Sequence, residues 1–326
     1  MHLLLRNRAA VLLLFLLLPS LAEGWGFFAH KRINRLAVFT LPPQMIQLYK
    51  AELDYITEHA TDPDKLRYVF PEEEFHHFID LDRYGSYPYP DLPRRRDSAQ
   101  RRYGADSLLH NGTVPWYAQR IFYRLTDAFR KKDKAHILKW SAYLGHYVAD
   151  ACVPLHAHSN YNGQQTGQEG IHALWESRIP ELLADRSFDY WTGKAVYIGN
   201  PQRYIWSLVM ESGRAADTVL KTEKSLSARF SADRRYAFLN RGGGMMRSYS
   251  PAYVRAYNQR LEGMVERRMR RAIQAVASLW YTAWVNAGQP ALDTLAPRSL
   301  SPAEAEQLKL LGEKWHQATP AGRTHE

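Results

Sequence analysis

Two pairs of a histidine and an acidic residue carry the clearest chemical signal in this chain. His146 and Asp150 are four residues apart in an apolar, aromatic stretch, and His172 and Glu176 repeat this spacing further on. Residues four apart share one face of an α-helix, so each pair can present an imidazole and a carboxylate to one metal ion or to two adjacent ions. Imidazole and carboxylate ligands without thiolate are typical of zinc at a catalytic site.

A single pair of this kind has a simpler explanation. Most such pairs are surface ion pairs or hydrogen-bonded histidines of the core. Two pairs on apolar helices are harder to explain in this way, because buried charges must be paired or bound to metal. Further candidate ligands lie nearby in the sequence: His156 follows Pro154 after the first pair, and Asp62, His77 and Asp80 lie upstream. The sequence therefore predicts a metal centre with several ligands.

The N-terminus offers a ligand of another kind. Residues 1–24 have the features of a secretory signal peptide, with a basic start, an apolar run and a small-x-small cleavage site at Ala22-Glu23-Gly24. Cleavage there makes Trp25 the new terminus, and a free α-amino group beside its own carbonyl can chelate a metal ion. His30 follows five residues later. We therefore expect a secreted or periplasmic protein whose terminus binds metal.

Helices must position these residues, because helical periodicity dominates the chain. Apolar residues recur at helical spacing over residues 27–39, 116–129, 136–153 and 261–287, the last being the longest such signal. No alternating pattern predicts a strand, and residues 84–102, rich in proline, tyrosine and arginine, are expected to form an irregular loop. We predict an all-α fold with one multi-helix domain over residues 25–290. Residues 291–326 are expected to add one short helix capped by Ser301 and a disordered end.

Composition limits the possible partners. The chain carries a formal net charge of +10, which suits nucleic acid or anionic phospholipid head groups but also fits a surface tuned for solubility. Cys152 is the only cysteine, so no intramolecular disulfide can form, and we interpret it as a small buried apolar residue. No apolar stretch after residue 24 approaches the ~20 residues of a membrane span. The mature chain is therefore expected to be soluble.

The ordered set of candidate ligands resembles one known superfamily. It is similar to the zinc-dependent phospholipases C and the fungal-type trinuclear-zinc nucleases, and the likeness covers roughly the first half of the chain. Each matching piece is short, but all of them occur in the order found in the superfamily. The pieces are Trp25-Gly26 with His30, Ala-Thr-Asp62, His77-Phe-Ile-Asp, His146-x3-Asp150, Pro-Leu-His156 and His172-x3-Glu176.

The resemblance implies three zinc ions and the superfamily's helical domain. It also implies catalytic roles for Asp62, which would orient the attacking water or act as the base, and for Asp150, which would bridge two ions. The implied ligands are Asp62, His77, His146 and Asp150 for one ion; the Trp25 amino group and carbonyl, His30 and Asp150 for a second; and His156, His172 and Glu176 for a third.

The expected activity is zinc-dependent hydrolysis of phosphodiester bonds. Glu176 and the lack of disulfides resemble the bacterial phospholipase C branch. This resemblance predicts that the substrate is a phospholipid head group and that the protein makes peripheral contact with a membrane. An exported single-strand nuclease or nucleotidase is the alternative, because His77-Phe-Ile-Asp and Pro-Leu-His156 are as close to that branch and Arg94-Arg95-Arg96 could bind nucleic acid. A zinc-binding protein without catalysis is a third possibility.

Overall fold

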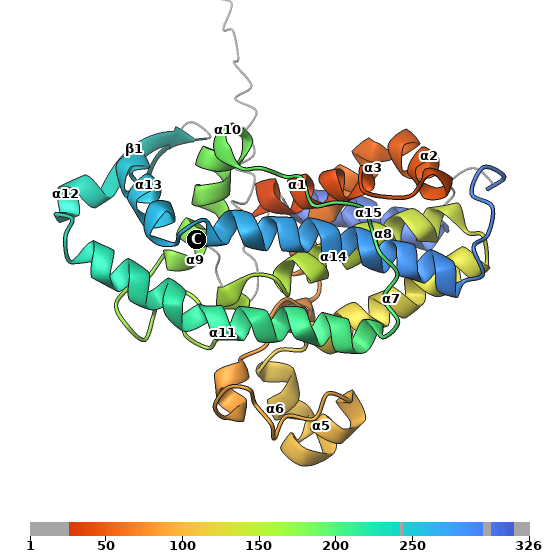
Figure 1. The fold of residues 1–326 in the computed structure, drawn as a ribbon, viewed down its shortest axis with the longest axis horizontal. Helices are drawn as coiled ribbons and strands as arrows, with labels where there is room; N and C mark the ends of the chain where they lie inside the picture. Colours follow the sequence, from red (N-terminus) through yellow and green to blue (C-terminus); the bar gives the residue numbers. More distant parts are fainter. Residues whose placement is uncertain (1–25, 242–243, 296–300, 316–326) are drawn as a thin grey trace, which may run out of the picture.

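The computed structural model describes residues 26–241, 244–295 and 301–315, which form helices and one two-stranded antiparallel sheet (Figure 1). The prediction of a predominantly helical protein is confirmed. Within the described residues, no helix combines the length and the hydropathy needed to cross a membrane. The predicted signal peptide, Trp25 and the predicted disordered end from Thr319 onward lie outside the described residues.

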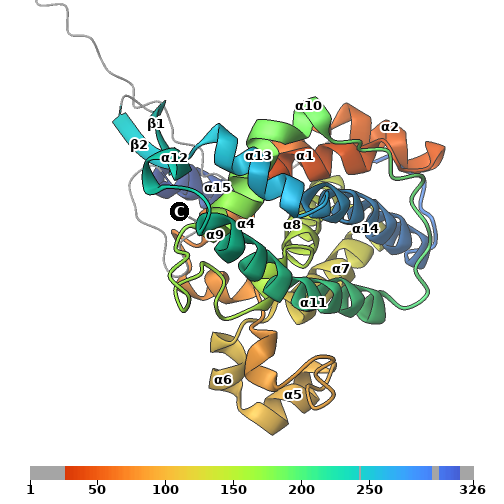
Figure 2. The same ribbon diagram turned by 60° about the vertical axis from the view of Figure 1, so that its left-hand side comes forward.

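The first part of the chain consists of short helices and helical turns. In order, they are α1 (Phe27–Val38), α2 (Pro43–Ala51), α3 (Leu53–Glu58), η1 (His59–Thr61), α4 (Asp62–Leu66), η2 (Pro71–His76), η3 (Leu81–Tyr84), α5 (Arg96–Tyr103) and α6 (Ala105–His110). Helices α5 and α6 lie below the main body in both views (Figures 1 and 2).

The second part contains the long helices. In order, the elements are α7 (Val114–Arg130), α8 (Lys134–Asp150), η4 (Pro154–Ala157), α9 (Ile171–Ala173), η5 (Leu174–Arg178), η6 (Pro180–Ala184), α10 (Asp185–Ser187), α11 (Pro201–Ser227), α12 (Ala232–Arg235), β1 (Tyr236–Arg241), β2 (Gly244–Tyr249), α13 (Pro251–Arg260), α14 (Met264–Asn286) and α15 (Pro302–Trp315). Segments η5 and η6 are π-helical.

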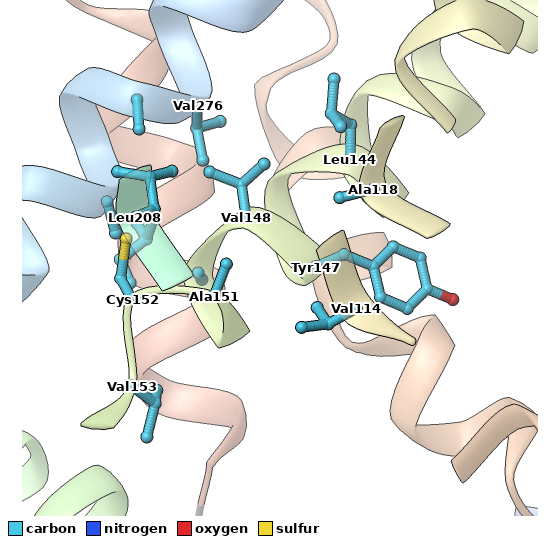
Figure 3. Close-up of a cluster of buried hydrophobic side chains, with 14 of the residues drawn as sticks. Val114, Ala118, Leu144, Tyr147, Val148, Ala151, Cys152, Val153, Leu208 and Val276 are labelled. Atoms are coloured by element: carbon cyan, nitrogen blue, oxygen red, sulfur yellow. The ribbon is translucent and has the colours of Figure 1, made fainter. Parts of the chain in front are cut away.

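Helix α8 lies at the centre of a bundle formed with α1, α7, α11 and α14. Asp133 directly precedes it, and the Asp133 side chain accepts a hydrogen bond from the backbone of His136 at 3.1 Å and so caps the first turn. Its apolar face is fully enclosed, and Figure 3 shows this part of the core. The residues labelled there are Val114, Ala118, Leu144, Tyr147, Val148, Ala151, Cys152, Val153, Leu208 and Val276. Burial of Cys152 agrees with its interpretation as a core residue.

Most of the predicted helices are present with small shifts. Helices α1, α7 and α8 fall where the periodicity placed them, whereas α14 begins only at Met264 because Gly263 adopts a left-handed conformation with φ of 75°. Helix α11 was not predicted, although its 27 residues make it longer than α14. The expected loop over residues 84–102 is irregular only as far as Arg95, since α5 starts at Arg96.

One short hairpin is present that no alternating pattern in the sequence indicated. Strands β1 and β2 form an antiparallel hairpin in which Tyr236 pairs with Tyr249 and Phe238 with Arg247. Each strand is six residues long, and exposed apolar residues occur on both faces of the hairpin. The alternation of apolar and polar residues that identifies a half-buried strand is therefore missing from the sequence.

The C-terminal helix α15 is capped as predicted. The Ser301 hydroxyl accepts a hydrogen bond from the Glu304 backbone at 3.3 Å, and the Glu304 carboxylate accepts one from the Ser301 backbone at 3.3 Å. The same carboxylate lies 3.0 Å from Lys139 Nζ and 3.0 Å from His136 Nε2 on α8. These contacts hold α15 against the helical body.

Candidate metal centre

Buried histidine and acidic side chains from several elements converge at one end of α8. We call these residues the ligand cluster. Each member is buried except Asp64, which is mostly buried. The members are His30 from α1, Asp64 from α4, His77 directly after η2, His146 and Asp150 from α8, His156 from η4, His172 from α9 and Glu176 from η5.

The first site of the cluster contains Asp64, His77, His146 and Asp150. Asp150 Oδ2 lies 3.0 Å from His77 Nδ1 and 3.2 Å from His146 Nε2, and these two nitrogens are 3.0 Å apart. Asp64 Oδ1 lies 3.7 Å from each nitrogen. Ligand atoms about 2.0–2.1 Å from a tetrahedral ion are about 3.3–3.4 Å from one another, so the atoms of His77, His146 and Asp150 have the spacing of a metal site, and Asp64 Oδ1 lies slightly farther from the two histidines.

The third site, which the resemblance assigns to a separate ion, contains His156, His172 and Glu176. Glu176 Oε2 lies 2.7 Å from His172 Nε2 and 3.2 Å from His156 Nε2, and the two nitrogens are 3.2 Å apart. Glu176 belongs to the π-helical segment η5, a rare conformation that is common at functional sites. His172 and Glu176 still point to one place, as their spacing in the sequence predicted.

The second site lies between the other two. His30 Nε2 is 3.4 Å from Asp150 Oδ1 and 3.5 Å from Glu176 Oε1. Both carboxylates therefore serve two sites: Asp150 directs one oxygen to the first site and one to the second, and Glu176 directs one oxygen to the second and one to the third. The bridging position of Asp150 was implied by the resemblance, whereas that of Glu176 was not anticipated.

Backbone carbonyls fix which ring nitrogen faces the cluster. His146 Nδ1 donates to Ala60 O at 2.8 Å, His156 Nδ1 to His77 O at 2.7 Å and His172 Nδ1 to Tyr161 O at 3.4 Å. A carbonyl oxygen can only accept, so Nδ1 carries the proton and the Nε2 lone pair of each neutral ring points inward. Lone pairs that converge in this way repel one another unless a cation lies between them. Hydrogen bonds of this kind orient histidine ligands in metal sites.

The buried carboxyl groups of the cluster are ionised, which favours a cation beside them. Burial opposes ionisation of Asp150, but His146 and His156 hold the pKa of this carboxyl well below its usual range. Burial likewise opposes the charge on Glu176, whose pKa His156 and His172 keep well below its usual value. Burial lowers the pKa of His77 to about 4, so this ring is neutral and free to bind metal. The cluster thus combines ionised carboxylates with the neutral imidazole of His77.

Asp62 does not join the ligand cluster, contrary to the expectation drawn from the resemblance. Its carboxylate lies 2.5 Å from His59 Nδ1 and 3.2 Å from Lys65 Nζ, and it is part of no group of possible ligands among the described residues. Asp64, two residues later in α4, directs its carboxylate toward the first site instead. The sequence Asp62-Pro63-Asp64 offers two acids, and only the helical turn at α4 decides which of them faces His77 and His146.

Trp25 lies outside the described residues, but the residue after it is close to the cluster. A Cβ atom added at Gly26 would lie 3.4 Å from Glu176 Oε1, the oxygen that faces His30. The chain therefore enters α1 beside the second site. This site has fewer described ligands than the first, and the position of Gly26 is compatible with a further ligand from the terminus.

The cluster communicates with the surface through a narrow cavity. The side chains around it include His77, His156 and His172, together with Phe78, Tyr161 and the buried Arg67. Arg67 and the partly buried Glu74 both belong to this lining, so one basic and one acidic side chain lie in the wall formed with the three histidines.

Comparison with known proteins gave no assignment. Neither the models of protein families nor the curated proteins contain a match to this chain.

Proposed function

We propose that this protein is a zinc-dependent phosphodiesterase of the phospholipase C type that acts on phospholipid head groups. One observation carries the proposal: three adjacent groups of buried ligands share the carboxylates of Asp150 and Glu176. Shared carboxylates favour several ions held close together. Several adjacent cations suit the hydrolysis of an anionic phosphate ester better than they suit a purely structural role.

The donor set favours zinc among the common metals. Every group contains at least one histidine nitrogen together with carboxylate oxygen, and the only cysteine, Cys152, is buried in the apolar core. Calcium and magnesium prefer sites built from oxygen alone, whereas imidazole suits zinc. We therefore propose the first site, the second site and the third site as three zinc positions, with the Trp25 terminus completing the second.

Zinc ions, when bound, neutralise phosphate oxygens and lower the pKa of a coordinated water toward ~7. The side chains of the protein have separate tasks. Arg67, buried in the lining of the cavity, adds positive charge beside the histidines of the cluster. Asp150 and Glu176 remain ionised and hold His30 between them. The bonds from His146 and His156 to backbone carbonyls keep both rings in place.

A substrate panel tests the proposal. Natively processed, zinc-loaded protein is incubated with phosphatidylcholine, single-stranded DNA, RNA and a chromogenic phosphodiester. We expect release of the phosphorylated head group from the lipid and turnover of the chromogenic diester. Glu176→Gln should abolish both activities, whereas His110→Ala, which changes an exposed histidine outside the cluster, should not. No turnover on any substrate would leave a zinc-binding protein without catalysis and refute the proposal.

A groove along α7 favours single-stranded nucleic acid as a second candidate substrate. It has a volume of about 510 Å³, and Arg96, Arg120, Arg124, Tyr117 and Tyr123 are among the residues that line it. Arginine charge and the exposed ring of Tyr123 can bind phosphates and stack on bases without regard to sequence. The groove begins at His76, directly before the ligand His77, so an extended strand in it would pass near the cluster.

The same panel separates the two candidates. Release of nucleotides from DNA or RNA without any turnover of lipid would favour the nuclease. In that case Arg120→Glu and Arg124→Glu together should weaken nucleic-acid turnover at least about tenfold, because charge reversal removes favourable contacts and adds repulsion. Turnover of the small chromogenic diester should be unaffected by this double variant.

A further inference from the structure

The hairpin of β1 and β2 carries an exposed apolar end. It extends from the helical body beside α12 and α13 in both views (Figures 1 and 2). Phe238 is 68% exposed, Met245 69% and Met246 37%. Large apolar side chains gathered at the end of a projecting element are uncommon on a soluble surface and mark a site of interaction.

These side chains occur on both faces of the hairpin. Cross-strand partners share a face of the hairpin, and so do residues two apart on one strand. Phe238 pairs with Arg247, and Met245 lies two residues before Arg247, so Phe238 and Met245 are on the same face. Leu239 pairs with Met246 on the opposite face. A protein surface would cover one face and leave the other in water, where polar residues are expected. Apolar residues on both faces instead fit a medium that surrounds the end of the hairpin.

The base of the hairpin is firmly held. Tyr249 is buried and stacks on Tyr253 with ring centroids 5.4 Å apart, and the Tyr253 hydroxyl donates to Glu223 Oε1 at 2.5 Å. The Tyr249 hydroxyl donates to Glu169 O at 3.4 Å, three residues before the ligand His172. The hairpin is thus fixed both to the helical body and to the segment that enters the ligand cluster.

Basic residues surround this base. Arg247 is exposed, and its guanidinium lies 4.4 Å from the ring centroid of Tyr236. Arg234 on α12 is exposed as well, and Arg235 follows it directly before β1. Arginines behind an apolar end have the arrangement required to contact lipid phosphates while the apolar side chains enter the membrane interface.

We propose that the hairpin of β1 and β2 docks this protein onto an anionic phospholipid surface through Phe238, Leu239, Met245 and Met246. Docking is shallow, because the outer edges of a two-stranded sheet carry unpaired backbone groups that cannot enter the hydrocarbon core. The hairpin then holds the segment before His172 near the head groups. This inference rests on the proposed function for the link to phospholipid turnover, but the binding itself can be measured separately.

Vesicle flotation tests the proposal with the mature, full-length protein. Vesicles of phosphatidylcholine are used with and without phosphatidylglycerol, and the protein is tested both zinc-loaded and chelated. We expect binding that is stronger with phosphatidylglycerol and persists after chelation. The double variant Phe238→Ser, Met245→Ser should bind at least about tenfold more weakly, because it loses two apolar side chains from the interface. Phe39→Ser, which removes a 50% exposed phenylalanine at the end of α1, should bind normally.

A fluorescent label tests the depth of contact directly. Met245→Cys can be labelled selectively with a polarity-sensitive dye, because the only native cysteine, Cys152, is buried. Emission should rise and shift to the blue when vesicles are added. The same dye on Phe39→Cys should show no change. A response that is equal at both positions would overturn the assignment to the hairpin.

Other outcomes separate the docking proposal from the proposed function. Wild-type protein that binds neither type of vesicle, or a double variant that binds as well as wild type, overturns docking. A double variant that changes the oligomeric state rather than vesicle binding assigns the hairpin to a protein interface and also overturns it. Vesicle binding without hydrolysis of any phosphodiester refutes only the catalytic proposal. The double variant should hydrolyse the soluble chromogenic diester at the wild-type rate.

Discussion

The choice between Asp62 and Asp64 is decided by side-chain direction. Asp64 Oδ1 lies 3.7 Å from both His77 Nδ1 and His146 Nε2, whereas Asp62 is engaged by His59 and Lys65. We expect Asp64→Asn to lower the zinc affinity of the first site and the turnover of a chromogenic diester at least about 100-fold. Substitution of residues that only support a metal ligand already lowers metal affinity or activity about 10–100-fold.

The matched variant Asp62→Asn should retain bound zinc, because the Asp62 carboxylate belongs to no group of possible ligands among the described residues. Zinc per protein, measured by elemental analysis at buffered free zinc, checks both variants. Equal loss of zinc in the two variants would contradict the assignment of Asp64, and loss only in Asp62→Asn would restore the ligand set implied by the resemblance.

The protonation of His30 should make the stability of the metal-free protein depend on pH. Burial opposes its charge, but hydrogen bonds to Asp150 and Glu176 raise its pKa well above the ordinary value of about 6.5. The folded state therefore holds this proton more tightly than the unfolded state. The resulting stabilisation is complete below about pH 6.5 and is lost as the pH rises through the higher pKa of the folded state.

Urea unfolding in the presence of a chelator measures this effect. The free energy of unfolding should fall as the pH rises above about 6.5, and His30→Gln should reduce that fall. His156, whose pKa is also raised despite burial, contributes in the same direction. His77, with its lowered pKa, acts oppositely and destabilises the folded state as the pH falls below about 6.5. If the free energy of unfolding of His30→Gln fell with rising pH as steeply as that of the wild type, the raised pKa of His30 would be contradicted.

At the scale of elements, a close approach of α1 and α8 sets the positions of His30 and His146. Gly145 faces Asn34, whose amide nitrogen donates to Ala142 O at 3.0 Å, and a Cβ at position 145 would overlap the Asn34 side chain. Gly145→Ala should destabilise the protein by about 1–3 kcal/mol, although alanine normally stabilises a helix relative to glycine. It should also weaken zinc binding by displacing the neighbouring His146.

Two further variants isolate the cause. Gly199→Ala adds a Cβ that meets no atom within 4 Å, so its free energy of unfolding should change by less than about 0.5 kcal/mol. Adding Asn34→Ala to Gly145→Ala should recover part of the loss, because the overlapping side chain is removed. Strictly additive effects of Asn34→Ala and Gly145→Ala would argue against the steric explanation.

The elements also show what the sequence could and could not predict. Helices with a continuous apolar face, such as α8, were predictable because periodicity and burial coincide. The spacing of His172 and Glu176 predicted that their side chains meet, even though the local helix is π-helical. The hairpin was not predictable from alternation, because both of its faces carry exposed apolar residues. Asp64 was missed because a turn of α4, and not the motif, orients its carboxylate.

At the scale of the whole molecule, the ligand cluster places a concentration of ionised groups inside a helical bundle. Asp150 and Glu176 are buried at 1% and 5% exposure, and Asp64 adds a third carboxylate beside them. Burying such charges is costly unless cations compensate them. Elements distant in the sequence, from α1 to η5, each contribute a side chain to this cluster. Bound metal should therefore contribute to the stability of the fold as well as to catalysis.

Removal of metal should consequently lower the melting temperature. A ligand present at 100 times its dissociation constant stabilises the folded state by about 2.7 kcal/mol for each site, which corresponds to a shift of roughly 4 °C for a protein of about 300 residues. We expect EDTA to produce at least this decrease in a thermal scan and zinc to reverse it. Chelation should shift His146→Ala less, because the first site is already impaired. A melting temperature unaffected by EDTA, in protein verified by elemental analysis to have lost its zinc, would show that the cluster is stable without cations and would remove the physical basis for a metal centre.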